Sequence, residues 1–161
     1  MARAPSSSKL GAQASNVTFN LHSLGWEAFQ NLCANVLREI LGQNVTSYSS
    51  SNDGGQDGTF KGTWRKTANE AYFGSIVVQC KFSAIQDEHL SLSHLKDELK
   101  KAARLAADGH ANTYLLMTNA KVTGSASLKI SKEFERLSGL QHFDILGGEW
   151  LTRQILGSKK L

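Results

Sequence analysis

The sequence predicts an α/β fold in which a central mixed β-sheet is flanked by helices, with an α-β-β-β-α-β core followed by a C-terminal α-β-α unit. Three observations predict it. Residues 21–42 place apolar residues at helical spacing, and residues 75–82 alternate as a strand does. From residue 91 onward, helical and strand patterns alternate. A hairpin-like set of strands followed by alternating helices and strands favours a mixed sheet with helices on both faces.

The first half of the chain is predicted to contain one helix and three strands. The helix covers residues 21–42, with Ser23 or Asn20 as its cap and Gly42 as its end. Its apolar stripe consists of Leu21, Leu24, Ala28, Leu32, Val36 and Ile40. Strands are expected at residues 44–49, 56–64 and 75–82, with a turn-rich loop after the first and a polar connection at residues 65–74.

The second half is predicted to alternate helices and strands. A helix is expected over residues 91–108, capped by Ser91 or Ser93 and ended by Asp108 and Gly109. A buried strand follows at residues 113–119, then an amphipathic helix at 124–139. The last strand is expected at residues 142–147 and the closing helix at 149–156.

The bulk composition is that of one globular domain. The chain has 161 residues, of which we assign 1–17 to a flexible leader, 18–157 to the domain and 158–161 to a tail of the kind that links to further domains. No apolar run could span a membrane and no secretory signal is visible, so we expect a cytoplasmic protein. Two cysteines without metal-site spacing indicate neither a disulfide framework nor a zinc site. The net charge of +4 permits binding to a polyanion without requiring it.

The residues that could carry chemistry lie in the second and third predicted strands. Gln79 and Lys81 are two positions apart, so their side chains leave the strand on the same face and interrupt an otherwise aliphatic segment. Asp57 follows a glycine pair. Mg²⁺ prefers oxygen ligands, which Asp57, the Gln79 amide and the backbone carbonyl of Cys80 can supply. Lys81 could hold the attacking water, stabilise the developing phosphate charge, or act as a base.

Each of these residues also has a simpler interpretation. Asp57 could be a turn residue after glycines, and Lys81 could be an edge-strand lysine that blocks aggregation. The aliphatic density of residues 75–82 argues for a central strand instead, where such a lysine is not needed. His94 and Lys96, on the helix that follows, could form a solvated face or contact phosphates.

The segments GGQDG and VVQCKF resemble the second and third motifs of the PD-(D/E)xK nuclease superfamily, in the QxK form of the Mrr-like restriction endonucleases. In this resemblance Asp57 takes the aspartate position, and Gln79 and Lys81 take the QxK positions. WEAFQNLCANVLREILG resembles the opening helix, TNAKVTGSA the later strand and helix start, and DILGGEWL the closing strand and helix, so the resemblance covers residues 24–156. One position departs from the pattern: Gln30 stands where the family has an acidic residue, and Glu27 lies one turn earlier. Either the first-helix metal ligand is absent, or Glu27 or Gln30 contributes in its place.

The resemblance implies a restriction-endonuclease-like fold and a Mg²⁺-dependent endonuclease, with Mn²⁺ as a substitute, that cleaves double-stranded DNA. It also implies a role in restriction or anti-phage defence and assembly as a homodimer or higher oligomer. The residues expected to contact DNA are Lys61, Arg65, Lys66, His94 and Lys96. The alternative is a catalytically inactive DNA-binding module of the same fold, which the departure at Gln30 keeps open.

Overall fold

The structure, a computed structural model, describes residues 19–42, 46–47 and 58–158. Its centre is a five-stranded sheet in the order β1-β2-β3-β4-β5. The strands are β1 (Thr46–Ser47), β2 (Gly58–Thr67), β3 (Glu70–Lys81), β4 (Thr113–Thr118) and β5 (His142–Leu146). The first three strands pair antiparallel, and β3, β4 and β5 pair parallel. The predicted mixed sheet is therefore confirmed.

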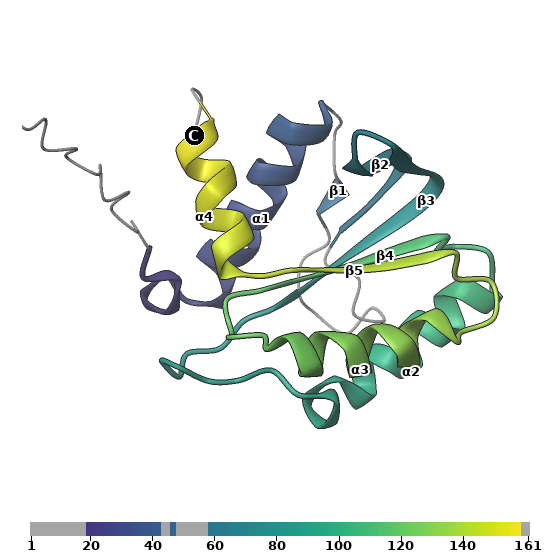
Figure 1. Cartoon of the computed structure of the whole chain (residues 1–161). Coiled ribbons are helices and arrows are strands. Elements are labelled where there is room, and N and C mark those ends of the chain that lie inside the picture. Colours follow the sequence, from purple (N-terminus) through teal and green to yellow (C-terminus); the bar gives the residue numbers. More distant parts are fainter. Residues whose placement is uncertain (1–18, 43–45, 48–57, 159–161) are drawn as a thin grey trace, which may run out of the picture.

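Helices cover both faces of this sheet (Figure 1). The helices are α1 (Trp26–Leu41), α2 (Lys96–Ala107), α3 (Gly124–Glu135) and α4 (Gly148–Gly157), with 3₁₀ turns η1 (Leu21–Ser23) and η2 (Leu92–Leu95). Helices α1 and α4 lie on one face, and α2 and α3 lie on the other. None of the described helices is long and apolar enough to cross a membrane.

Strand β3 contributes to the core on both faces of the sheet. Ile76 and Val78 belong to the cluster under α1 and α4, whereas Val77 belongs to the cluster under α2 and α3. The predicted alternation is therefore confirmed, and Gln79 and Lys81 share the face of Val77. That face is the one that α2 covers.

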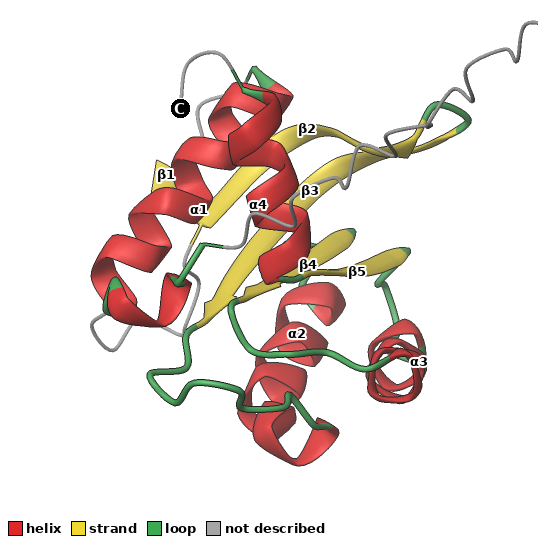
Figure 2. Cartoon of the chain, turned by 60° about the vertical axis from the view of Figure 1, so that its left-hand side comes forward, coloured by secondary structure: helices red, strands yellow, loops and turns green. Residues whose placement is uncertain are grey.

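The connection predicted at residues 65–74 is wrong. Strand β2 continues to Thr67 and β3 begins at Glu70, so a tight turn joins two long strands. The hairpin extends past the edges of β4 and β5, because pairing between β3 and β4 begins only at Ile76 (Figure 2). Backbone pairing between the strands outweighs the polar character of this stretch, which on sequence alone favours a loop.

The predicted apolar stripe of the first helix is partly wrong: Leu21 and Val36 are buried and Leu32 packs against the core, but the other three residues are exposed. The buried residues of α1 are Phe29, Cys33, Val36 and Leu37. Ala28 is exposed, as are Leu24 and Ile40. Both stripes have helical spacing, and the observed one buries a phenylalanine ring that the predicted one leaves out.

The helix also begins later than predicted. It starts at Trp26 after Gly25, and neither Asn20 nor Ser23 caps it, because the Ser23 hydroxyl donates instead to the Asn20 carbonyl at 2.8 Å. Gly42 ends the helix in the left-handed conformation, as predicted.

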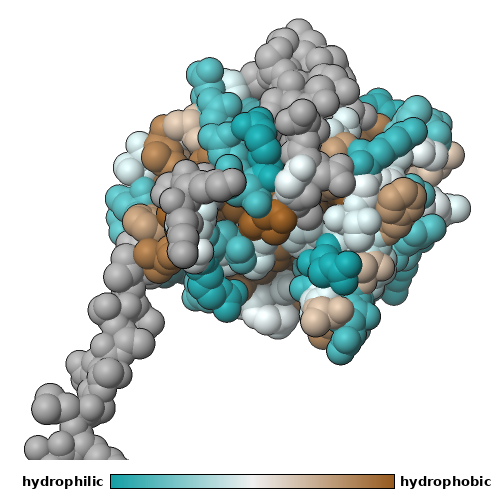
Figure 3. Space-filling view, turned by 90° about the horizontal axis from the view of Figure 1, so that it is seen from above, coloured by the Kyte–Doolittle hydropathy of each residue, from teal (hydrophilic) through white to brown (hydrophobic). Residues whose placement is uncertain are grey.

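The remaining elements agree with the sequence to within a few residues. Ser91 precedes the 3₁₀ turn that leads into α2, and Asp108 follows the last residue of α2. The predicted leader 1–17, the strand ends at residues 44–45, 48–49 and 56–57, and residues 159–161 of the tail lie outside the described residues. From above, hydrophobic residues form separate patches among hydrophilic ones (Figure 3).

Candidate active site

Gln79 and Lys81 lie at the carboxyl end of β3, next to β4. They pair in register with Leu116 and Thr118 of that strand. Gln79 is buried, and the Tyr114 hydroxyl donates to its amide oxygen at 3.4 Å. Lys81 lies two residues further along the strand, and its side chain is 36% exposed. The strand therefore presents a buried amide and a partly exposed ammonium on one face.

The Lys81 ammonium forms an ion pair with Glu98 of α2. Its Nζ donates to Glu98 Oε1 at 2.9 Å. The Glu98 side chain is only 9% exposed. Its other oxygen, Oε2, is buried and has no hydrogen-bond partner among the described residues. A buried carboxylate oxygen thus lies beside the lysine.

The end of β3 is fixed by a backbone clamp from the next strand. The Asn119 side chain accepts from the Ser83 amide at 2.8 Å and donates to the Ser83 carbonyl at 2.8 Å. His22 Nδ1 lies 2.9 Å from the same carbonyl. Because Asn119 follows directly after β4, the clamp ties the carboxyl ends of the two strands together. Lys81, two residues before Ser83, is thereby held at a defined position.

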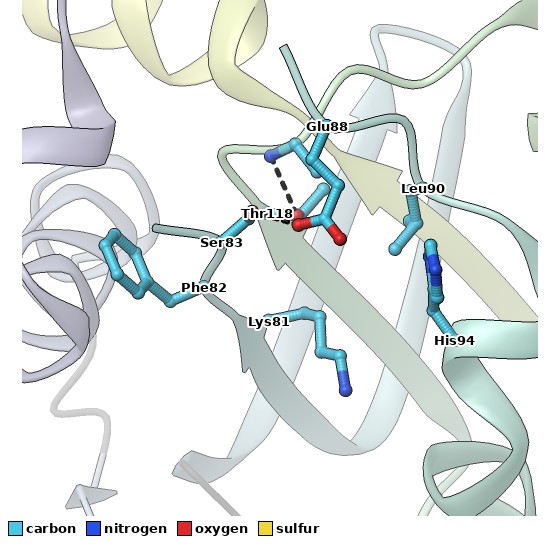
Figure 4. Close-up of a pocket in the computed structure, with 8 residues that line it drawn as sticks. Lys81, Phe82, Ser83, Glu88, Leu90, His94 and Thr118 are labelled. Carbon is cyan, nitrogen blue, oxygen red and sulfur yellow. Dashed lines mark hydrogen bonds between the residues drawn. The ribbon is translucent and has the colours of Figure 1, made fainter. Parts of the chain in front are cut away.

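A cavity of about 220 Å³ opens beside Lys81. Its lining consists of Lys81, Phe82, Ser83, Glu88, Leu90, His94, Thr118 and Ala120. Figure 4 shows Lys81 and Phe82 leaving β3 in opposite directions, with His94 across the cavity from β3. Phe82 packs toward α1, where its ring centroid lies 5.7 Å from that of Phe29. The ammonium and an imidazole therefore border one opening.

The far wall of the cavity is built by the loop between β3 and η2. Its Glu88 carboxylate accepts a hydrogen bond from the Ser83 hydroxyl. The Leu90 amide donates to the Lys121 carbonyl at 2.8 Å, and the Lys121 amide donates to the Glu88 carbonyl at 2.8 Å. The loop is thus tied to the segment that follows β4.

His94 enters this cavity with one ring nitrogen already used. The Ser91 amide donates to His94 Nδ1 at 3.3 Å. In the neutral ring the proton then sits on Nε2, which can donate to an anion. The structure therefore brings His94 and Lys81 together at one cavity.

Asp57 lies outside the described residues. The described chain resumes at Gly58, which pairs with Val78, the residue before Gln79. Cys80 pairs with Met117 and packs its side chain against the core under α1. No group of three or more His, Cys, Asp or Glu side chains that could hold a metal occurs within the described ranges.

The described donors are nevertheless chemically suited to Mg²⁺. The amide oxygen of Gln79 and the orphaned carboxylate oxygen of Glu98 are hard oxygen donors on the same side of the sheet. The donor types thus fit a hard divalent cation, and Asp57 precedes Gly58, the first residue of β2, in the sequence.

Glu27 and Gln30 occupy different environments on α1. Glu27, in the first turn, is exposed, whereas Gln30 is half-buried at the border of the stripe that packs on the sheet. Both also lie on the helix that covers the opposite face of the sheet from Lys81.

The basic residues predicted to contact DNA separate into two groups. Lys61 and Arg65 are exposed on β2 and have the strand parity of Thr59, which pairs with Val77, so they share the sheet face of Lys81. Lys66 instead lies near enough to His142 to influence its pKa. Lys96 lies two residues before Glu98, about 200° away around α2, and points away from the sheet.

Glu98 is the residue that sequence reasoning missed. On sequence alone it is one of several charges, with Asp97, that alternate with lysines on this helix and favour a solvated face. The buried residues of this helical segment are Leu95, Glu98, Ala102, Leu105 and Ala106. Glu98 therefore sits inside an apolar stripe of helical spacing, and a wheel drawn for residues 95–106 carries that signal.

The comparisons with known proteins give one family. A family model described as restriction endonuclease, Mrr_cat, matches residues 21–141, which is most of the chain. The match extends from η1 to the residue before β5 and includes β2, β3 and α2. No curated protein matches the chain.

Proposed function

Because the chain belongs to the restriction endonuclease family Mrr_cat, we propose that it is a Mg²⁺-dependent endonuclease that hydrolyses DNA phosphodiester bonds. The observation that carries the proposal is the pair Gln79 and Lys81 on one face of β3, with the Lys81 ammonium fixed by Glu98 beside an open cavity. A cationic side chain beside a cleft can stabilise the negative charge of a DNA phosphate that binds there. The biological setting we propose is restriction or defence against foreign DNA.

The residues of the site have distinct roles in this proposal. Asp57, the Gln79 amide oxygen and the Cys80 carbonyl hold the metal, with Mn²⁺ as a substitute. A bound Mg²⁺ polarises the phosphodiester and lowers the pKa of a coordinated water. Lys81 orients the attacking water or stabilises the charge that develops on the phosphate.

The DNA backbone is proposed to cross the site from the cavity to the hairpin. His94 Nε2 donates to a phosphate at the cavity, and Lys61 and Arg65 contact phosphates along β2. Lys66 and Lys96 face elsewhere and are left out of this interface. Cleavage of both strands requires two sites, so a homodimer or a larger oligomer is part of the proposal.

The test is plasmid cleavage by the full chain with Mg²⁺ and with EDTA. We expect Lys81→Gln to lower the cleavage rate by about 10²- to 10³-fold, because the ammonium is lost at the reacting phosphate. Glutamine is preferred to alanine, since its amide can still donate to Glu98 and avoids leaving a buried carboxylate alone. Lys96→Gln is the matched control and should cleave as the wild type does. Equal cleavage by Lys81→Gln would contradict the assignment.

A second candidate is a DNA-binding module of the same fold without catalysis. The observation that favours it is Gln30, half-buried on α1 at the position where the family's acidic residue is expected. Salt-dependent DNA binding, without cleavage in either Mg²⁺ or Mn²⁺, would select this function over the first.

A further inference from the structure

Glu98 is a buried acidic residue that the family motif does not include. It lies in the first turn of α2, where a carboxylate is favoured by the helix dipole. Its side chain is 9% exposed, and its partner among the described residues is the Lys81 ammonium at 2.9 Å. The pair links α2 to the end of β3 across a separation of 17 residues.

The energetics of this pair point away from a purely structural role. Burying a carboxylate is costly, and an ion pair offsets that cost only when both oxygens are well satisfied. Here Glu98 Oε2 has no hydrogen-bond partner among the described residues. An apolar residue in the stripe of Leu95 and Ala102 would pack without that penalty. A costly buried group whose charged partner lines a cleft, as Lys81 does, is typical of functional sites.

The Lys81 side chain would have another conformation open to it if Glu98 were absent. Its side chain is 36% exposed and lines the cavity, so without Glu98 the flexible four-carbon chain could turn into solvent. Ser83 and Asn119 fix only the backbone of this region. Among the described residues, the ion pair with Glu98 is the contact that fixes the direction of the ammonium.

We propose that Glu98 is the positioning residue of Lys81, holding its ammonium at the reacting phosphate in every turnover. This inference rests on the proposed nuclease function. Glu98 acts through Lys81. It supplies a negative charge from α2, whereas the motif on β3 has the neutral Gln79 beside Lys81. The site is then built from two elements, β3 and α2.

The experiment compares Glu98→Gln with Asp97→Asn in the full chain. Both substitutions remove one carboxylate from the first turn of α2, but Asp97 is exposed. We expect Glu98→Gln to lower kcat for plasmid cleavage by about tenfold to a hundredfold, the cost of a misplaced group, with KM for DNA unchanged. Asp97→Asn should keep both values. An unchanged kcat in Glu98→Gln, or a change in KM alone, would overturn the proposal.

Glu98→Asp tests position separately from charge. It keeps the carboxylate but shortens its reach, so kcat should fall between those of the wild type and Glu98→Gln. Thermal melting of each variant shows whether it is folded. If Glu98→Gln is unfolded, Glu98→Asp carries the test, and wild-type kcat in folded Glu98→Asp together with an unmoved lysine signal overturns the proposal.

A second measurement does not depend on cleavage. In a ¹H–¹⁵N spectrum of the lysine ammonium groups, the Lys81 signal is the one absent from Lys81→Gln. We expect this signal to move and weaken in Glu98→Asp and Glu98→Gln, and not in Asp97→Asn, because the ammonium loses its fixed partner. If the wild type does not cleave DNA, the proposed function fails, while the spectrum still reports on the pair. If the wild type cleaves and the Lys81 signal is unmoved, the positioning role fails.

Discussion

His142 is a buried titratable residue at the start of β5, on the opposite face of the sheet from Lys81. Its ring stacks on that of Tyr72, with centroids 3.8 Å apart and an interplanar angle of 4°. Its Nε2 is buried without a hydrogen-bond partner among the described residues, and Asp144 Oδ2 lies 3.8 Å away. Burial lowers the pKa of His142 below the usual 6.5, and Lys66 lowers it further, whereas Asp144, Glu70 and Glu135 act in the opposite direction.

This lowered pKa predicts a loss of stability on acidification. The unfolded chain takes up the proton near pH 6.5, before the folded chain does, so the free energy of unfolding falls as the pH drops below about 6.5. The loss ends below the folded-state pKa, where both states are protonated. We expect His142→Phe, which keeps a ring beside Tyr72, to flatten the pH dependence of urea unfolding between pH 7 and pH 5. His110→Phe, at an exposed histidine, should leave the slope unchanged. A wild-type slope in His142→Phe would contradict this account.

At the residue scale, strand parity was the part of the site that sequence could predict. Gln79 and Lys81 were placed on one face by alternation alone, and β3 has that alternation. The ion pair with Glu98 was not predictable in the same way, because it joins a strand to a helix that packs on it. Only the docking of α2 on the sheet decides which charges of a lysine-rich helix become buried.

The hairpin of β2 and β3 is the element that most changes the expected shape of the molecule. Beyond Ile76 it has no neighbouring β4 strand, and Figure 2 shows it projecting from the sheet. Phe73 is 76% exposed and pairs with Thr63, so it shares a face with Lys61 and Arg65. A projecting two-stranded ribbon with basic side chains has dimensions that a DNA groove accepts.

This arrangement predicts that two adjacent basic residues differ in their effect on DNA binding. Arg65→Ala should weaken binding several-fold and reduce the slope of log K against log salt by about 1, because one phosphate contact is lost. Lys66→Ala should leave both the affinity and the slope unchanged, since Lys66 lies toward His142. Fluorescence anisotropy with a labelled duplex, without metal, measures both values. Equal losses in the two variants would show that the face of β2 does not select the contacts.

At the element scale, prediction from the sequence failed where the same residues fit two different structural patterns. Residues 65–74 are polar enough for a loop, and only their pairing across the turn at Ala68 and Asn69 makes them strands. In α1 two stripes share Val36, and the one containing Phe29 and Leu37 is buried. Packing against the sheet selected between these patterns, and local propensity carries no information about that choice.

At the scale of the whole molecule, the sheet separates two hydrophobic cores, one on each of its faces. The core under α1 and α4 contains aromatic side chains from β2, namely Phe60 and Trp64. The core under α2 and α3 contains Tyr114, Phe134 and Phe143. The proposed site lies at the edge of the second core, where β3 ends against α2. Metal bound there would be linked to folding, because its ligands belong to elements that come together only in the folded chain.

That linkage predicts a metal-dependent melting temperature. A ligand that binds only the folded state stabilises it by about 2.7 kcal/mol when present at a hundredfold excess over its Kd. For a chain of this size, about 1 kcal/mol corresponds to roughly 2–4 °C in Tm. We therefore expect saturating Mg²⁺ or Mn²⁺ to raise the Tm of the full chain by about 5–10 °C relative to EDTA, measured by calorimetry without DNA.

Asp57→Asn should remove most of that rise in Tm, because the proposed carboxylate ligand is lost while the shape of the side chain is kept. Asp53→Asn, the other aspartate of the same glycine-rich segment, is the matched control and should respond to metal as the wild type does. Equal responses in Asp57→Asn and Asp53→Asn would remove Asp57 from the metal site. A wild-type Tm that does not move with either cation would argue against a metal site in this chain, and cleavage without added metal would then have to be sought.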